Sequence, residues 1–296
     1  MRPYLFKIGG FELRIYSLMY ILAFLFGMFI CLADDVAEKR GVDDRKTIED
    51  FVFATIVAGL IGARLYYVIF KFPDYAGDPL SIFYIWQGGL AIHGGIIGAF
   101  VGACLFARKS KVNLWVLTDM GVGPLLFGQF LGRFGNLANG EVHGVPTFTP
   151  WNVIFSGKFS EWWAKYQTLG VAEQAQFKQL VPWGLTFPLD TPAGSEFPNL
   201  PLHPAMLYEG ALNLIGFLIL WFYFRKKEYN PGVLSMIYLI IYAIIRTFVS
   251  TFRAEDLLIF GIRLPYIISI IMIIIGIVGI KYFSRPERKF VPADRK

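Results

Sequence analysis

The sequence predicts an all-α polytopic membrane protein, with seven transmembrane helices and a small extracytoplasmic head between spans four and five. Two observations carry this prediction. Of the 296 residues, 55% are hydrophobic and 17% are charged, and the mean hydropathy is +0.52, whereas about a quarter of the residues of a soluble domain are charged. Apolar runs of the roughly 20 residues needed to cross a bilayer recur along most of the chain. A soluble protein with a buried core is the weaker interpretation.

The predicted spans are bounded by charged residues, proline or glycine. The first is too long for the apolar region of a signal peptide, and no Ala-x-Ala-like site follows it, so we expect it to stay attached. The seven spans cover about residues 16–32, 51–70, 88–107, 114–132, 205–224, 232–252 and 265–283 of a single membrane domain, 1–296. An odd number of spans places the two termini on opposite sides of the membrane.

The distribution of lysine and arginine predicts the orientation, because cytoplasmic loops retain these residues. The segments after spans one, three, five and seven hold four, three, three and six of them, sixteen of the chain's 28. These segments are therefore expected in the cytoplasm, with the N-terminus outside and the C-terminus inside. The pI of 9.2 then follows from this bias and favours anionic membrane lipids, so we expect no nucleic-acid partner.

Residues 135–203 form the one extended stretch without a span, and we predict a small head on the outer face. Four of the chain's seven tryptophans lie in it. Because tryptophan and tyrosine favour the headgroup level, the segment from Phe159 to Leu180 is predicted to be an amphipathic helix that rests on the membrane interface.

The cysteine and histidine positions argue against redox and metal chemistry. Cys31 and Cys104 lie inside spans near their predicted cytoplasmic ends, where burial makes a thiol a packing group and a disulfide is not expected. The three histidines have neither of the close spacings typical of zinc ligands. With no Walker loop or dinucleotide fingerprint either, the sequence predicts no metal and no cofactor.

The most informative stretch runs from Gly132 to Gly144, GRFGNLANGEVHG, where the fourth span ends in a cluster of polar groups. It offers the guanidinium of Arg133, the carboxamides of Asn136 and Asn139 and the carboxylate of Glu141. A guanidinium fork suits phosphate, and glycine lets a ligand approach the backbone. The plain alternative is a helix end with a glycine cap, an Asn-Gly turn and a snorkelling arginine, but a turn alone needs fewer polar groups.

Other polar residues lie inside the predicted spans, where each costs free energy unless it is paired or solvated. Arg64 in GARLYY is either half of a structural ion pair or a ligand-binding group. His93 in GGLAIHGG is either a helix-packing histidine or a functional one. Arg246 and Arg253 are seven residues apart, which places them on one helix face about 10.5 Å apart and suggests an anionic ligand.

The fifth span opens with His203 and Pro204, and Tyr208 and Glu209 follow one turn inside. A carboxylate near a helix N-terminus interacts favourably with the helix dipole, so capping is one explanation of Glu209. A role in the same polar site is the other.

Taken together, these stretches resemble the bacterial prolipoprotein diacylglyceryl transferases over nearly the whole chain. The resemblance rests on IYSLMY around Tyr16, GARLYY, LAIHGG, GRFGNLANGEVHG, HPAMLYE from His203, and the two arginines of span six. It implies an inner-membrane enzyme that moves diacylglyceryl from phosphatidylglycerol to the lipobox cysteine of prolipoprotein signal peptides, releasing glycerol phosphate. It also implies important roles for Tyr16, His93, Arg133, Asn136, Glu141, Gly144 and Arg246.

One position departs from the family pattern. The family usually carries a glutamate four residues after the arginine of span six, and this chain has Ser250 there. Arg246 therefore lacks an obvious partner one turn away, so the lipid, Glu141, Glu209 or Glu255 is expected to satisfy it.

The chemistry implied by the resemblance needs a thiol to lose its proton and a phosphate to leave. His93 suits the first task by its ordinary pKa near 6.5, with Glu141 or water as the alternatives. Arg133 and Arg246 suit the second. The predicted catalytic residues are His93, Arg133, Asn136, Glu141 and Arg246. The predicted substrate-binding residues are Arg133, Tyr16, Arg64, Gly94, Gly95, Asn139, Gly144, His203, Tyr208, Glu209 and Arg253.

A transporter or flippase for an anionic lipid is the main alternative, because intramembrane arginines also bind substrates in transporters. Two features argue against it. The polar cluster lies at the outer end of span four, and seven spans show no clear two-fold repeat. A structural scaffold would not need His93, Arg133 and Glu141 together.

Overall fold

The computed structural model describes residues 4–8, 11–33, 42, 44–85, 88–254, 257–259 and 261–285. Within them, seven helices are long and apolar enough to cross a membrane, which confirms the predicted helical membrane class. These helices are α1 (Ile15–Ala33), α3 (Arg45–Phe70), α4 (Ile92–Ser110), α5 (Leu114–Asn139), α10 (Ala205–Ile219) with the π-helical turn η4 (Leu220–Phe224), α11 (Val233–Phe252) and α12 (Leu264–Phe283).

Three helix boundaries differ from the expected spans by four residues or more. Helix α3 begins six residues early because the side chain of Asp44 accepts bonds from Lys46 N and Thr47 Oγ1, at 3.1 and 2.9 Å, and so caps the helix. Helix α4 begins at Ile92, after Gly88 and Gly89 with φ of 92° and 77°. Helix α5 continues to Asn139, seven residues beyond the predicted end, so the first half of the polar cluster is helical.

The described chain divides into two compact units. The residues up to Gly27 and from Val122 onward form the first unit, and those from Met28 to Gly121 form the second. The boundaries fall inside α1 and α5, so each of these helices contributes to both units.

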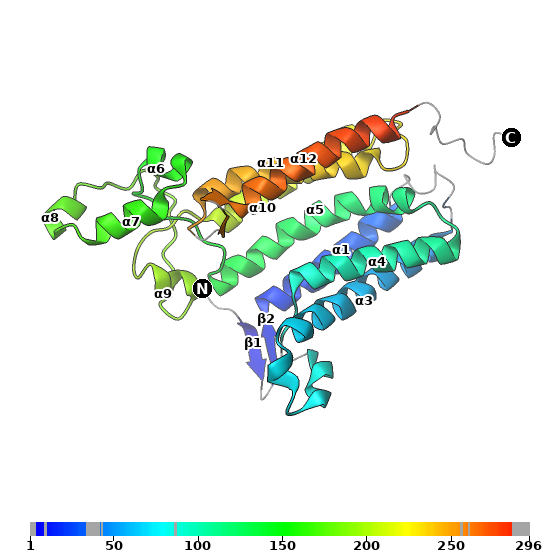
Figure 1. The fold of residues 1–296 in the computed structure, drawn as a ribbon, viewed down its shortest axis with the longest axis horizontal. Coiled ribbons are helices and arrows are strands. Elements are labelled where there is room, and N and C mark those ends of the chain that lie inside the picture. Colours follow the sequence, from blue (N-terminus) through cyan, green and yellow to red (C-terminus); the bar gives the residue numbers. More distant parts are fainter. Residues whose placement is uncertain are drawn as a thin grey trace. The chain divides into compact units, whose positions relative to one another are not determined.

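In the second unit, α3 and α4 lie side by side (Figure 1) and pack through glycine. A Cβ atom on Gly62 would come 2.7 Å from Gly98 Cα, so larger residues cannot replace glycine at this contact. Small residues of this kind let membrane helices approach closely and pack well without polar groups. The short 3₁₀ helices η1 (Phe72–Tyr75) and η2 (Pro79–Phe83) lie in the connection between the two helices.

In the first unit, α10, α11 and α12 lie side by side (Figure 1). Half of the residues in the membrane-crossing stretch of α11 are buried (50%), compared with 44% for α10 with η4 and 11% for α12, so α12 is the outer helix of the three. The N-terminal strands β1 (Tyr4–Ile8) and β2 (Phe11–Arg14) form an antiparallel hairpin that leads into α1. Strands β3 (Leu258–Ile259) and β4 (Ile262–Arg263) form a second short hairpin before α12.

The residues between α5 and α10 form a small head with four short helices, α6 (Trp151–Ser156), α7 (Phe159–Gln167), α8 (Val171–Gln174) and α9 (Pro192–Glu196). The prediction of one interfacial helix from Phe159 is wrong, because α7 ends at Gln167. Its tryptophans also pack inward: the ring centroid of Trp163 lies 5.2 Å from that of Phe197. Phe159 is therefore part of a buried apolar cluster, and Trp162 and Trp163, which are partly buried, pack against it.

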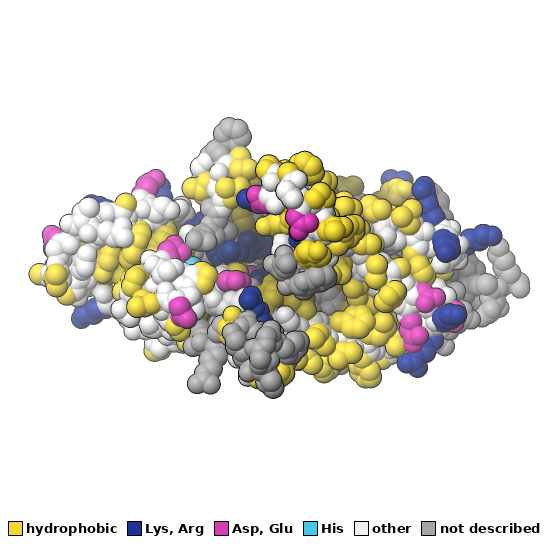
Figure 2. Space-filling model, turned by 90° about the horizontal axis from the view of Figure 1, so that it is seen from below, with side chains coloured by type: hydrophobic (Ala, Val, Ile, Leu, Met, Phe, Trp, Pro, Cys, Tyr) yellow, Lys and Arg dark blue, Asp and Glu magenta, His cyan; other side chains and the backbone are white. Residues whose placement is uncertain are grey.

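Large apolar side chains are exposed along the spans. Phe29, Phe53 and Ile69 are 67%, 66% and 69% exposed, and hydrophobic side chains form broad patches with few charges among them in Figure 2. Soluble monomers rarely expose such patches, which therefore fit contact with lipid. Neither Cys31 nor Cys104 forms a disulfide. No group of three or more His, Cys, Asp or Glu residues suited to a metal ion occurs in the described part of the chain.

Candidate functional site

Polar side chains of the first unit converge where α5, α10 and α11 meet. Arg133 and Asn136 are one turn apart near the end of α5, and Arg133 Nη1 donates to Asn136 Oδ1 at 2.9 Å. Arg133 Nη2 donates to Glu209 Oε1 of α10 at 2.5 Å. The stem of Arg133 lies over Gly210, where a Cβ atom would come 3.3 Å from Arg133 Cβ. A glycine at this position therefore gives the arginine room beside α10.

Glu209 is fully buried and joins two arginines. Its Oε2 atom lies 3.7 Å from Arg246 Nη1 of α11, while the side chains of both arginines keep 20% exposure. These contacts explain Glu209 better than helix capping does. Of the partners expected for Arg246, the structure thus supplies Glu209, whereas Glu255 lies outside the described residues. Ser250 is buried, and its carbonyl oxygen accepts a bond from Arg263 Nη1.

The chain turns sharply after α5 and brings Glu141 back to the end of the helix. Glu141 N donates to Asn136 O at 2.9 Å, and the Glu141 carboxylate accepts from Asn136 Nδ2 and Asn139 Nδ2, both at 3.3 Å. Val142 has φ of 59°, which a β-branched residue rarely adopts and which often marks a functional site. A continuous polar chain therefore links Glu209, Arg133, Asn136 and Glu141.

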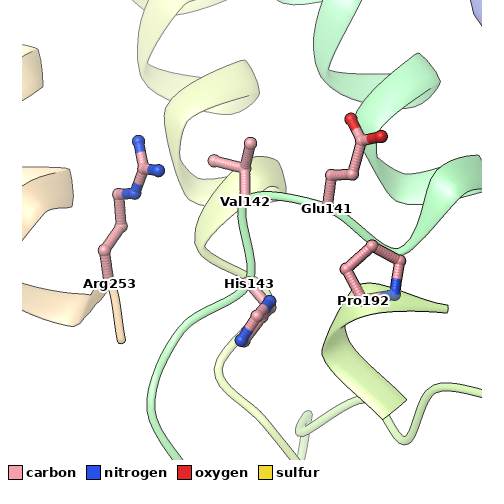
Figure 3. Close-up of a pocket in the computed structure, with 5 residues that line it drawn as sticks. All are labelled: Glu141, Val142, His143, Pro192 and Arg253. Carbon is pink, nitrogen blue, oxygen red and sulfur yellow. The ribbon is translucent and has the colours of Figure 1, made fainter. Parts of the chain in front are cut away.

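A pocket of about 240 Å³ lies beside this turn, lined by Glu141, Val142, His143, Pro192 and Arg253. In Figure 3 the carboxylate of Glu141 and the guanidinium of Arg253 stand on either side of Val142 and point the same way. His143 lies below them, and its Nε2 atom is 3.0 Å from Glu196 Oε2. The pocket thus offers a ligand one negative and one positive group on opposite walls.

Tyr16 of α1 packs against the same end of α5. A Cβ atom on Gly135 would collide with the Tyr16 ring, so this glycine allows the close approach. The Tyr16 hydroxyl lies 2.9 Å from that of Tyr20, one turn further along α1. The contact with Gly135 places Tyr16 beside the end of α5 that carries Arg133 and Asn136.

Buried His203 and half-buried Tyr208 form a hydrogen-bonded network with Trp183 of the head, which is exposed. Trp183 Nε1 donates to Tyr208 Oη at 2.7 Å, and Tyr208 Oη lies 3.1 Å from His203 Nδ1. Burial lowers the pKa of His203 to about 4, so the imidazole is neutral at pH 7. Because tryptophan can only donate, Tyr208 Oη accepts from Trp183, and its own hydroxyl proton can be donated to His203 Nδ1.

Gly144 joins three parts of the first unit through its backbone. Gly144 N donates to His203 O at 2.8 Å, and the next residue, Val145, donates to Phe252 O at 2.9 Å. A Cβ atom on Gly144 would come 2.7 Å from both carbonyl oxygens. Gly144 is therefore required for packing between the end of α11, the entry to α10 and the turn after α5.

In the second unit, the guanidinium of Arg64 binds backbone carbonyls. It donates to Ser81 O and Ile82 O, both at 2.7 Å, and to Gly88 O and Gly89 O at 2.7 and 3.0 Å. These four bonds occupy most of its five N–H donors. Arg64 therefore holds the connection between α3 and α4, which favours the structural interpretation, and its role in substrate binding stays a prediction.

The other predicted residues of the second unit lie at the start of α4. Gly94 has no room for a Cβ atom beside Tyr66 and the carbonyl of Gly62, and a Cβ on Gly95 would contact Ala63 Cβ at 3.6 Å. Both glycines therefore pack α4 on α3. His93 is exposed, with its ring centroid 6.1 Å from that of Tyr66.

Comparison with known protein families matches residues 3–282 to the family Prolipoprotein diacylglyceryl transferase. The chain belongs to this family. Three relatives carry the name phosphatidylglycerol-prolipoprotein diacylglyceryl transferase. The protein of Fusobacterium nucleatum subsp. nucleatum is 51% identical over 294 residues, 98% of this chain and 100% of the relative. That of Synechocystis sp. is 33% identical over 283 residues, which are 94% of this chain and 88% of the relative. That of Thermotoga maritima is 32% identical over 297 residues, which cover 97% of this chain and 87% of the relative.

In this member of the prolipoprotein diacylglyceryl transferase family, several contacts escaped sequence reasoning. Tyr20 shares a hydrogen bond with Tyr16, and its spacing of four residues was a visible helical signal. Gln129, a polar residue four positions before Arg133 in an apolar run, donates to Tyr238 Oη at 3.1 Å. Glu196 and Trp183, the partners of His143 and Tyr208, gave no sequence signal, because their pairing depends on how the head folds.

Proposed function

We propose that this chain transfers the diacylglyceryl group of phosphatidylglycerol to the cysteine thiol of prolipoproteins, the first step of lipoprotein maturation. The full-length family relationship supports this activity. Within the structure, the observation that carries it is the pair of partly exposed arginines, Arg133 and Arg246, arranged around buried Glu209. Such a pair offers positive charge and hydrogen-bond donors to a phosphate at the end of the spans.

The reaction is a displacement at carbon. The substrate sulfur attacks the terminal glycerol carbon of the diacylglyceryl group, the bond from that carbon to the phosphate oxygen breaks, and a thioether forms. The thiol proton passes to a base. The phosphate changes from a diester with one negative charge to glycerol phosphate, a monoester that gains a second. Arg133 and Arg246 are placed to stabilise this developing charge.

We assign the remaining polar residues around these arginines to the same site. Asn136 orients Arg133 and connects it to Glu141, and Asn139 holds the other oxygen of the Glu141 carboxylate. Arg253 lines the same pocket as Glu141, and we assign it to contact with a polar part of either substrate. Tyr16 borders this cluster from α1.

The thiol needs a base because its ordinary pKa is near 8.5. We propose His93 for this role, since imidazole is a suitable base at neutral pH. Its ring is exposed at the start of α4. Glu141 and water are the alternatives that a variant of His93 separates.

The acceptor we propose is a signal peptide with a lipobox cysteine. Both this peptide and phosphatidylglycerol are amphipathic, so they are expected to enter from the bilayer between apolar spans. Exposed side chains such as Phe29 and Ile69 provide the lipid-facing surface. The protein is then a multi-pass protein of the bacterial inner membrane, in contact with membrane lipids.

We propose that the N-terminus and the head between α5 and α10 face the periplasm and that the C-terminus faces the cytoplasm. The excess of basic residues after spans one, three, five and seven supports this orientation. Alkaline phosphatase fused after Lys227 should be inactive, because this enzyme folds only outside the cytoplasm. An active fusion at this position would reverse the proposed orientation.

The function is tested with purified protein, phosphatidylglycerol vesicles and a synthetic lipobox peptide, without an energy source. Mass spectrometry should detect a peptide heavier by one diacylglyceryl group, and the same peptide with serine in place of cysteine should remain unmodified. Movement of lipid between leaflets without any modified peptide would favour a lipid transporter and would overturn the proposal.

A further inference from the structure

We propose that Glu209 is a positioning residue that also sets the charge of the phosphate site. It holds Arg133 and Arg246 at a fixed spacing and cancels one of their two positive charges. The three side chains then carry one net positive charge, which suits a phosphodiester that binds with one negative charge and a phosphomonoester that must leave with two. This inference rests on the proposed function and concerns the same site.

The first argument is that Glu209 is buried more deeply than the two arginines. Glu209 has no exposed surface, whereas the side chains of Arg133 and Arg246 are each 20% exposed. A ligand can therefore touch the arginines but not the carboxylate behind them. Because Glu209 does not reach the substrate, its effect on the reaction has to pass through the two guanidinium groups.

The second argument is that the two carboxylate oxygens of Glu209 face arginines on two different helices. Oε1 accepts from Arg133 Nη2 of α5 at 2.5 Å, and Oε2 lies 3.7 Å from Arg246 Nη1 of α11. Each oxygen faces a different arginine, so one rigid group on α10 sets the separation between the two. Without it, two like charges would repel each other in surroundings of low dielectric constant.

The third argument concerns Ser250 and Glu141, two other positions from which, among the described residues, a carboxylate could be expected to reach these arginines. Ser250, one turn after Arg246, is buried and carries no charge. Glu141 is engaged by the amides of Asn136 and Asn139. Glu209 is therefore the carboxylate that the described structure places against both arginines.

The charge balance bears most strongly on release of the product. Cleavage of the carbon–oxygen bond leaves glycerol phosphate with a second negative charge, so two uncompensated arginines would bind the product more tightly than the lipid. Tight product binding slows turnover without aiding the chemical step. Glu209 reduces this difference in affinity between product and lipid, while the exposed parts of both arginines can still contact the transition state.

The experiment compares Glu209→Gln with Glu209→Asp in the full-length protein. Glutamine keeps the size and one acceptor oxygen but removes the charge, and aspartate keeps the charge but shortens the side chain. For Glu209→Gln, we expect inhibition by glycerol phosphate to become roughly tenfold stronger, because one opposing charge near the site is lost. For Glu209→Asp, turnover should fall about tenfold through misplacement of the arginines, with product inhibition within about twofold of wild type.

The double variant Glu209→Gln with Arg246→Gln provides a further test, because it restores one net positive charge. Its inhibition by glycerol phosphate should return toward the wild-type value while turnover stays low. Glu161→Gln, which removes an exposed carboxylate from α7 in the head, is the matched control and should change neither quantity.

Equal losses of turnover in Glu209→Gln and Glu209→Asp, with unchanged product inhibition in both, would show a merely structural role and overturn the proposal. Binding of glycerol phosphate by calorimetry gives the same comparison without turnover and applies to any variant that elutes as a folded protein. If the wild-type protein modifies no lipobox peptide, the proposed function fails. The calorimetric comparison still tests Glu209 in that case.

Discussion

Arg64 in the second unit and Arg133 in the first show how differently two arginines inside membrane helices can be stabilised. Arg64 donates four bonds to backbone carbonyls of the connection between α3 and α4. Arg133 donates to two side chains, those of Asn136 and Glu209, and keeps part of its surface exposed. The four bonds to backbone carbonyls use most of the donors of Arg64 and make it part of the scaffold. The two bonds of Arg133 to side chains leave donors for a ligand.

Helix packing also differs between the two units, with a structural contact in the second and a functional one in the first. Helices α3 and α4 approach through glycines such as Gly62 and Gly98. Helices α5, α10 and α11 meet around a buried carboxylate. The glycine contact requires only close packing, whereas the polar contact satisfies buried charges and places them for chemistry. We therefore expect variants of the first unit to change mainly turnover, and variants of the second unit other than His93 to change mainly stability.

The largest effect is expected for Arg133→Lys and Arg246→Lys. Lysine keeps the charge but loses the planar fork, so each variant should lose roughly 2 to 4 kcal/mol of transition-state stabilisation. Turnover and the affinity for phosphatidylglycerol are measured for both single variants and for the pair. If the losses are small and simply add, or if uncharged lipids serve equally well as donors, the two arginines do not share one phosphate.

His93→Gln tests whether the second unit also contributes chemistry. Glutamine preserves volume and hydrogen bonding but is not a base, so turnover at neutral pH should fall by roughly 10²-fold. It should recover in part at higher pH, as the substrate thiol, with a pKa near 8.5, ionises without help. A near-normal rate across the pH range would transfer the role to Glu141 or water and would leave the second unit purely structural.

Arg64→Lys should mainly reduce stability. An ammonium group cannot reproduce the fork that reaches Ser81, Ile82, Gly88 and Gly89, and the loss of charged hydrogen bonds is expected to cost about 1.5 to 3 kcal/mol of unfolding free energy. Thermal unfolding in detergent measures this, and turnover is expressed per folded molecule. A strong loss of specific turnover at normal stability would return Arg64 to the substrate-binding residues.

The smallest effect is expected for Cys31→Ser combined with Cys104→Ser. Both cysteines lie in the second unit, where Cys31 is buried and Cys104 is half-buried. The nucleophilic thiol belongs to the substrate, so turnover should be unchanged within about twofold, apart from the modest cost of a hydroxyl in an apolar setting. Loss of turnover in the well-folded double variant would point to an enzyme-bound intermediate.

The helix boundaries show where sequence reasoning reached its limit. Hydropathy located all seven spans, because transfer of an apolar segment into the bilayer depends on composition. It placed the end of α5 at residue 132, although the helix continues to Asn139. The polar residues of its last turns remain helical because partners such as Glu209 and Glu141 satisfy them, and hydropathy cannot register partners from elsewhere in the chain.

The sequence by itself determined the membrane class, the spans and the motif at Arg133, since these follow from local composition and spacing. Only the tertiary structure decided which charges meet. Arg133 and Glu209 are separated by 76 residues, and nothing in their local sequence distinguishes this pairing from capping by Glu209 or from an arginine that binds the backbone, as Arg64 does. A buried charge takes the partner that packing brings within reach, and that choice depends on the arrangement of α5, α10 and α11.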